Sequence, residues 1–117
     1  MSKSPLDLLL HIADEVEFLL NESSSMDESV FQLDEKAKRA FARSFEVIGE
    51  ASKCVPDDLK SKYPDIDWKS MARMRDRLIP HYFGVDYSVV WDTVINDIPY
   101  LYEAINSIIK DISVAER

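Results

Sequence analysis

Apolar residues recur every three or four positions along most of the chain, which is the spacing of one face of an α-helix. The first such stretch predicts a helix over about residues 5–21, with Ser4 as its N-cap and Pro5 in its first turn. A second stretch follows Asp34, a candidate N-cap, and Pro56 ends it. The core-facing positions of these two predicted helices are Leu8, Leu9, Ile12, Val16, Leu19 and Leu20, then Ala37, Ala40, Phe41, Ser44, Phe45, Ile48, Ala51 and Val55.

The second half of the chain predicts two more helices. The third begins at a cap, Asp65 or Asp67, and Pro80 disturbs its end because proline lacks an amide proton and clashes with the preceding turn. Its core-facing positions are Trp68, Met71, Ala72, Met74, Leu78 and Ile79. The segment between the second and third helices, residues 56–67, holds at most one short helical turn.

Gly84 closes the third element, and Asp86 caps a last helix that runs to about residue 112. Pro99 lies inside this last pattern and predicts a kink. No pair of segments reads as strands, and two glycines are too few for a turn-rich β protein. The pattern therefore predicts an all-α fold, an up-down four-helix bundle with one short additional helix, formed as a single domain by residues 1–117.

Charge is distributed unevenly along the chain, whose net charge is −8. Residues 36–81 hold eleven lysines and arginines against seven acids, residues 1–35 hold one against nine, and residues 82–117 hold two against six. The overall charge argues against a general nucleic-acid binder, because attraction to phosphates needs a basic surface. The basic middle third leaves two interpretations open, a local anion-binding surface or helix faces with internal salt bridges.

The single cysteine, Cys54, excludes a disulfide within the chain and favours a reducing compartment. We interpret it as a small buried hydrophobic residue. No apolar run approaches the roughly 20 residues of a membrane span, and the N-terminal segment does not read as a signal peptide. A cytoplasmic protein without a membrane partner is the expectation.

Neither histidine stands in a metal-binding pattern. His11 has Asp7, Asp14 and Glu15 at helical spacing, but without a second histidine or a thiolate nearby a solvated surface histidine is the favoured interpretation. A di-iron bundle would need Glu-x-x-His pairs on facing helices, and the chain contains none. We therefore expect no metal and no cofactor.

The segment RMRDRLIPHYFGVDY, residues 73–87, gathers groups that suit phosphate chemistry. When the 2′-hydroxyl of RNA attacks the adjacent phosphorus, a group with a near-neutral pKa has to move protons, and histidine does this best. A fixed cation has to stabilise the charge on the phosphoryl oxygens, which the planar fork of arginine does well. Arginine and histidine in one short segment could supply both without a metal, although such residues also cluster for structural reasons.

This segment resembles the Arg-x(4–6)-His signature of the HEPN superfamily, in the HepT-like branch whose motif is Arg-x4-His-x-Tyr. FEVIGEASK, the stretch from YPDIDW to VVWDTV, and IPYL are also similar to that branch, over about residues 40–101. The resemblance implies a homodimer with the motif at its interface, acting as a metal-independent endoribonuclease toxin on tRNA or mRNA. It further implies a partner, a minimal nucleotidyltransferase of the MntA type, which neutralises the toxin by AMPylation of the motif tyrosine.

Carried over residue by residue, the family arginine is Arg75, the polar residue after it is Asp76, and the motif tyrosine is Tyr82. The histidine departs from the pattern. The usual position, five after the arginine, holds Pro80, and His81 follows one residue later. Two accounts are open: a local bulge restores His81 to its place, or this protein lost cleavage and kept the scaffold.

Other residues support the motif. Arg77, four residues before His81, would lie on nearly the same helix face, and Glu50 in IGEA is expected to form a structural ion pair with a motif arginine. Trp68 and Trp91 are expected to be core or dimer anchors. The sequence thus predicts a ribonuclease toxin with Arg75 and His81 as its catalytic residues. The alternative is a non-catalytic helical module that binds and regulates a partner nucleotidyltransferase.

Overall fold

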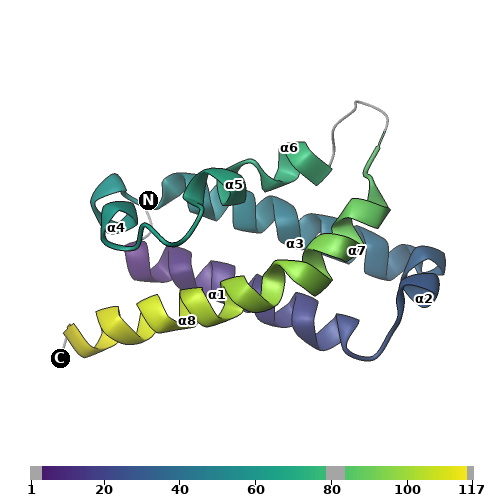
Figure 1. Cartoon of the computed structure of the whole chain (residues 1–117), viewed down its shortest axis with the longest axis horizontal. Coiled ribbons are helices and arrows are strands. Elements are labelled where there is room, and N and C mark those ends of the chain that lie inside the picture. Colours follow the sequence, from purple (N-terminus) through teal and green to yellow (C-terminus); the bar gives the residue numbers. More distant parts are fainter. Residues whose placement is uncertain (1–3, 79–83, 116–117) are drawn as a thin grey trace.

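A computed structural model describes residues 4–78 and 84–115 of the chain, and these residues form helices without a strand. Figure 1 shows their arrangement as an elongated bundle. The helices are α1 (Pro5–Ser23), α2 (Glu28–Leu33), α3 (Glu35–Cys54), α4 (Asp57–Lys62), α5 (Trp68–Ala72), α6 (Met74–Leu78), α7 (Tyr87–Asn96) and α8 (Ile98–Ala115). The predicted all-α class is confirmed. No helix in the described ranges is both long and apolar enough to span a membrane.

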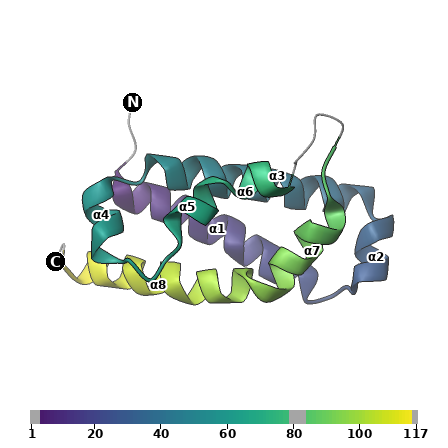
Figure 2. The same cartoon turned by 45° about the horizontal axis from the view of Figure 1, so that its top comes forward.

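Four long helical paths make the bundle: α1, α3, the pair α5–α6, and the pair α7–α8. Helix α1 packs against α3 and α8, and α5 and α6 pack against α3. Figure 2 shows α3 with α5 and α6 along one side of the molecule and α8 along the other, with α1 between them. This is the up-down arrangement that the sequence predicts.

Side-chain caps fix the helix starts. The four predicted caps accept a hydrogen bond from the backbone N–H three residues later, which satisfies a donor that the first turn would otherwise leave free. The donor–acceptor distances are 3.1 Å for Asp7 N to Ser4 Oγ, 3.0 Å for Ala37 N to Asp34 Oδ1, 3.0 Å for Ser70 N to Asp67 Oδ1, and 3.2 Å for Val89 N to Asp86 Oδ1. Of the two candidate caps for the third helix, the structure uses Asp67.

The last two helical paths are interrupted. The predicted third helix divides at Arg73 into α5 and α6. The predicted last helix divides at Asp97 into α7 and α8, and Pro99 lies in the first turn of α8, where its missing N–H leaves no hydrogen bond unmade. The predicted kink is thus confirmed as a break between two helices.

The number of short helices differs from the prediction. The single turn expected between residues 56 and 67 is α4, but α2 is a second short helix that the sequence analysis missed. Only Phe31 of α2 is buried, so the segment has no apolar period to detect. Its start is nevertheless capped, since Asp27 Oδ1 accepts a hydrogen bond from Val30 N at 2.9 Å.

Aromatic residues fill one end of the core. The Phe31 ring lies 4.9 Å from the Phe41 ring and 5.2 Å from the Trp91 ring, centroid to centroid. Trp68 and Trp91 are each 8% exposed, so both serve as core residues of the chain. Burying such rings is among the largest apolar contributions that single residues make.

The interpretation of Cys54 is wrong, because its side chain is exposed. Ala51, Ser52 and Val55 take the buried positions at this end of α3. Cys54 lies one step around the helix from that stripe and faces solvent.

Gly49 lets α3 approach the α5–α6 segment closely. A Cβ atom at this position would lie 3.5 Å from the Met71 carbonyl oxygen, 3.6 Å from that of Ala72 and 3.9 Å from the Arg75 nitrogen. These are ordinary van der Waals distances, so one methyl group fits and a larger side chain does not.

Substitutions at Gly49 test this packing. We expect Gly49→Ala to be neutral or stabilising, since alanine favours a helix interior over glycine by about 0.5–1 kcal/mol. Gly49→Leu should lower the free energy of unfolding by about 1–3 kcal/mol through overpacking. Urea denaturation followed by circular dichroism measures both, with the same two substitutions at the exposed Arg39 of α3 as controls. A Gly49→Leu protein as stable as the wild type would contradict the close approach.

Candidate active site

Helix α6 carries three of the predicted site residues: Arg75, Asp76 and Arg77. Met74 and Leu78, at its two ends, are buried and face the core. With 100° of rotation per residue, Arg75 and Arg77 therefore emerge on opposite flanks of the helix and Asp76 points outward. A helix of this length is too short to be stable alone, so its place depends on its neighbours.

Arg77 binds a residue of α7, Thr93, and also Asp97, which directly follows that helix. Its Nη2 donates a hydrogen bond to Thr93 Oγ1 at 2.6 Å and lies 3.3 Å from Asp97 Oδ2. Thr93 is buried, and its hydroxyl in turn donates to the Val89 carbonyl at 2.7 Å. The predicted supporting residue Arg77 is thus engaged within the fold.

Arg75, by contrast, presents its charge to solvent. Its side chain is 50% exposed, and its ion pair in the described part of the chain is with the neighbouring Asp76, at 3.7 Å. That distance is long for an ion pair between exposed groups, which contributes little. The guanidinium therefore keeps donors available for an anion.

Glu50 forms the expected structural ion pair, but with a different partner. Its Oε1 lies 3.3 Å from Lys53 Nζ, one turn further along α3. Among the described residues no ion pair joins Glu50 to a motif arginine. The pairing with an arginine was wrong because Lys53 lies on the same helix face, three residues away.

His81 and Tyr82 lie outside the described residues. The structure fixes the two ends of their segment, since Asp86 N donates a hydrogen bond to the Leu78 carbonyl at 2.8 Å. Gly84, near the second end, has a φ of +156°, a backbone conformation that favours glycine. The end of α6 and the start of α7 are therefore tied together on either side of this segment.

A concavity runs along the outer face of α5 and α6. It is lined by Asp67, Lys69, Ser70, Arg73, Asp76 and Arg77. Hydrogen bonds from the backbone N–H and the hydroxyl of Ser70 lower the pKa of Asp67, which caps α5. The Arg73 N–H donates to the Lys69 carbonyl at 3.0 Å, so these two exposed cations lie one turn apart.

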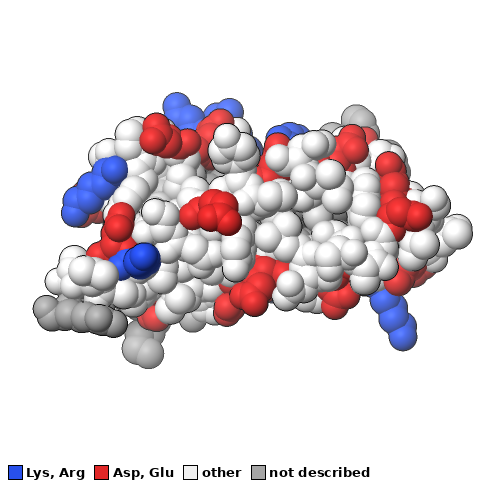
Figure 3. All heavy atoms as spheres, turned by 60° about the horizontal axis from the view of Figure 1, so that its bottom comes forward, with Lys and Arg blue, Asp and Glu red and all other residues white. Residues whose placement is uncertain are grey.

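Acidic and basic residues separate between the two sides of the bundle. Figure 3 turns one long side forward and shows acidic side chains across it, with basic ones mainly at its edges. The acids of α1 and α8 are Asp7, Asp14, Glu15, Glu17, Glu22, Glu103 and Asp111, against Lys110 alone. The other side is mainly basic: α3, α5, α6 and the intervening Arg73 expose Lys36, Arg39, Arg43, Lys53, Lys69, Arg73, Arg75 and Arg77, against the acids Glu35, Glu46, Glu50 and Asp76.

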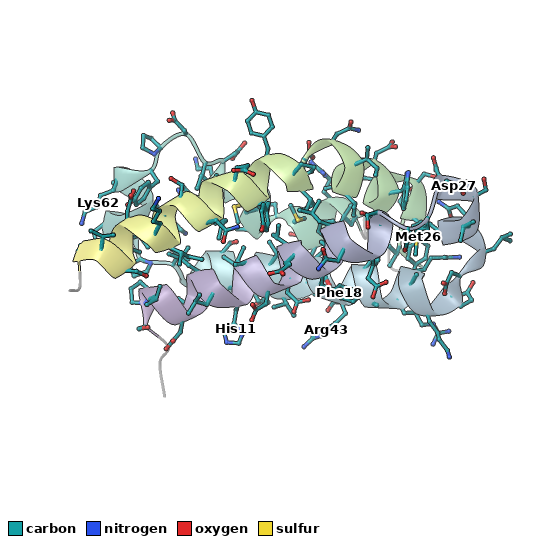
Figure 4. The ribbon with its side chains drawn as sticks, turned by 90° about the horizontal axis from the view of Figure 1, so that it is seen from below. His11, Phe18, Met26, Asp27, Arg43 and Lys62 are labelled. Atoms are coloured by element: carbon teal, nitrogen blue, oxygen red, sulfur yellow. The ribbon has the colours of Figure 1, made fainter. Side chains whose placement is uncertain are left out.

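The expectation of a surface histidine at His11 is confirmed. Figure 4 shows His11 and Arg43 pointing away from the bundle. Within residues 4–78 and 84–115, no group of three or more histidine, cysteine and acidic side chains is arranged to hold a metal ion.

Two residues that fix α6, Thr93 and Asp97, were missed by the sequence analysis. The sequence patterns gave neither residue a role at the site. The available signal was their spacing, since two polar residues four apart share one helix face and can bind one arginine.

Comparison with known proteins identifies the family of this chain. The family model "Ribonuclease HepT-like" matches residues 11–108. A protein of Methanocaldococcus jannaschii with a provisional RNase name is 46% identical over 106 residues, which are 91% of this chain and 84% of the relative. A protein of Thermococcus cleftensis, provisionally named ribonuclease HepT, is 46% identical over 101 residues, 86% of this chain and 92% of the relative.

A third relative, from Caldanaerobacter subterraneus subsp. tengcongensis, also has a provisional RNase name. It is 40% identical over 108 residues, 92% of this chain and 96% of the relative. No solved structure matches the chain significantly. The family model and the relatives each cover most of the chain, which therefore belongs to the HepT-like ribonuclease family of the HEPN superfamily.

Proposed function

We propose that the protein is a metal-independent endoribonuclease toxin that cuts tRNA or mRNA with Arg75 and His81. The observation that carries this proposal is the half-exposed Arg75 on α6, a short helix held on both flanks. His81 follows the end of that helix by three residues, which span at most about 11 Å. The family and the names of the relatives support ribonuclease chemistry.

The chemistry is a transesterification within RNA. A base takes the proton of a 2′-hydroxyl, whose oxygen attacks the adjacent phosphorus, while an acid gives a proton to the departing 5′-oxygen. The products are a 2′,3′-cyclic phosphate and a 5′-hydroxyl. His81 moves protons, and Arg75 stabilises the charge that builds up on the phosphoryl oxygens.

RNA would bind on the side of the bundle formed by α3, α5 and α6. The exposed cations gather there, whereas α1 and α8 present acids that repel phosphates. Because the whole chain carries a charge of −8, binding should be local and sensitive to salt.

A homodimer would supply the second proton-transfer group. The reaction needs an acid and a base, and the segment around Arg75 holds one histidine. A two-fold axis beside this segment would bring two copies of Arg75 and His81 into one cleft. Asp76, which points outward beside Arg75, would then lie at the rim of that cleft.

Tyr82 would be the site of neutralisation by a partner nucleotidyltransferase of the MntA type. It directly follows His81, so AMP attached to its hydroxyl would place a bulky anion where RNA has to enter. Negative charge beside Arg75 would also compete with the phosphate of the substrate.

One observation favours a second function. The arginine and the histidine are separated by five residues instead of four, and a histidine out of place would leave a helical module that binds a nucleotidyltransferase without cutting RNA. The two functions differ in whether the purified protein cleaves.

An assay for cleavage of tRNA and mRNA in the presence of a metal chelator distinguishes the ribonuclease from the non-catalytic binding module. We expect the wild type to cut, and Arg75→Ala and His81→Ala each to reduce the rate at least about 100-fold. This is the lower range for loss of a charge-stabilising group or of a proton-transfer group. Lys110→Ala, which removes an exposed cation of α8 on the acidic side of the bundle, is the control and should cut as the wild type does.

Equal inactivity of all four proteins, with Tyr82 verified as unmodified and the oligomer as intact, would refute the nuclease and leave the binding module. Cleavage that stops only when the chelator is added would refute the metal-independent mechanism.

Mixing chains tests the shared site. Wild type incubated with an excess of His81→Ala chain should lose activity per wild-type chain, because most of its dimers then contain one histidine of the pair. An excess of His11→Ala chain, which alters the exposed histidine of α1, serves as the control and should leave activity unchanged. If the excess of His81→Ala chain has no effect although mixed dimers are present, each protomer acts alone.

A further inference from the structure

We infer that the hydrogen bond from Arg77 to Thr93 is a positioning contact for the reaction, because it sets the direction in which α6 presents Arg75. This inference rests on the proposed function for its kinetic consequence. It assigns Arg77 to the scaffold and adds Thr93, on a different helix, to the residues on which cleavage depends.

The geometry at Thr93 is that of a fully satisfied contact. The hydroxyl accepts from Arg77 Nη2 at 2.6 Å and donates to the Val89 carbonyl at 2.7 Å, so its single proton is committed to α7 and its lone pair faces Arg77. Thr93 is 2% exposed, so water does not compete for this contact as it does at the more exposed Asp97.

The contact holds one flank of α6 while α3 holds the other. Arg75 and Arg77 are separated by two residues, or about 200° around the helix. The Arg75 nitrogen is the backbone atom of α6 near Gly49 of α3, and the Arg77 side chain reaches α7. Figure 1 shows α6 above α3, at the level where α7 crosses.

Without the contact between Arg77 and Thr93, α6 would be free to turn about its own axis. The apolar anchors Met74 and Leu78 lie on one side of α6 and resist withdrawal from the core better than they resist turning about the helix axis. Turning would swing Arg75 away from the phosphate. Catalytic sites need their groups within about 0.5 Å and 10–20° of the productive geometry. A turn of α6 would therefore weaken stabilisation of the transition state more than it weakens substrate binding.

A pair of substitutions at Thr93 isolates the hydroxyl. Thr93→Val keeps the shape and removes both hydrogen bonds, while Thr93→Ser keeps the hydroxyl and removes a methyl group. We expect Thr93→Val to lower kcat for RNA cleavage about tenfold or more with KM within about twofold of the wild type, a loss of transition-state stabilisation. Thr93→Ser should recover most of that loss.

The control is Ser52→Ala in α3. Ser52 is also buried, and its hydroxyl donates to the Ile48 carbonyl at 2.7 Å, but no arginine of α6 is bound to it. Its loss should lower stability without lowering kcat. If Thr93→Val fails to fold, Arg77→Met provides the second variant, because the half-exposed Arg77 leaves no cavity when it is shortened.

A second readout does not depend on activity. The Nε–H signal of Arg75 in nitrogen-15 NMR spectra should shift or broaden in Thr93→Val or Arg77→Met and return in Thr93→Ser. If that signal responds while the wild type cleaves no RNA, the positioning contact stands and the proposed function fails. If the wild type cleaves but Thr93→Val retains full kcat, or Ser52→Ala loses as much, the positioning role is overturned.

Discussion

The contact of the α5–α6 segment with α3 is the constraint on which the candidate site depends. α6 has too few residues to hold its own shape, and Arg75, whose side chain could act on a phosphate, is attached to it. Close approach at Gly49 brings its backbone against α3, and the buried Met74 and Leu78 fix its depth. The place of Arg75 is therefore set by packing that does not involve its own side chain.

Two neighbouring arginines of this helix have different environments, and the difference follows from their position around the axis. Arg77 turns toward α7 and meets an acceptor that is already buried there. Arg75 lies on the opposite flank and keeps half of its side chain in solvent. Charge is separated on a larger scale in the same way, with exposed cations on α3, α5 and α6 and acids on α1 and α8. An acidic protein can thus keep one surface suited to a polyanion.

Much of the fold could be predicted from the sequence because its signals are local. The helix starts are indicated by residues that favour the N-cap position, Ser4, Asp34 and Asp86. The spacing of apolar residues identifies the helix faces that pack into the core. α2 was not predicted because it buries one side chain, Phe31, and therefore shows no periodic pattern of apolar residues. Cys54 was misplaced because residue type favours burial, whereas its position at the helix end turns it outward.

The candidate site was less accessible to such reasoning. Arg75 could be singled out by resemblance. The partner of Arg77, Thr93, follows sixteen residues later on another helix, and sequence spacing does not report contacts across a bundle. The partner of Glu50 was missed for the opposite reason, since Lys53 on the same helix outcompetes a distant arginine. Predictions held for the helix starts and the core faces, and failed for α2, for the side chain of Cys54 and for the partners of Arg77 and Glu50.

Analysis of the RNA ends left after incubation with the wild-type protein and a metal chelator tests the central claim most directly. Attack by the 2′-hydroxyl, with Arg75 and a histidine as the only catalytic groups, predicts 2′,3′-cyclic phosphate and 5′-hydroxyl ends. Ends with a 3′-hydroxyl and a 5′-phosphate would show that water attacked the phosphorus, and would contradict this account of the site.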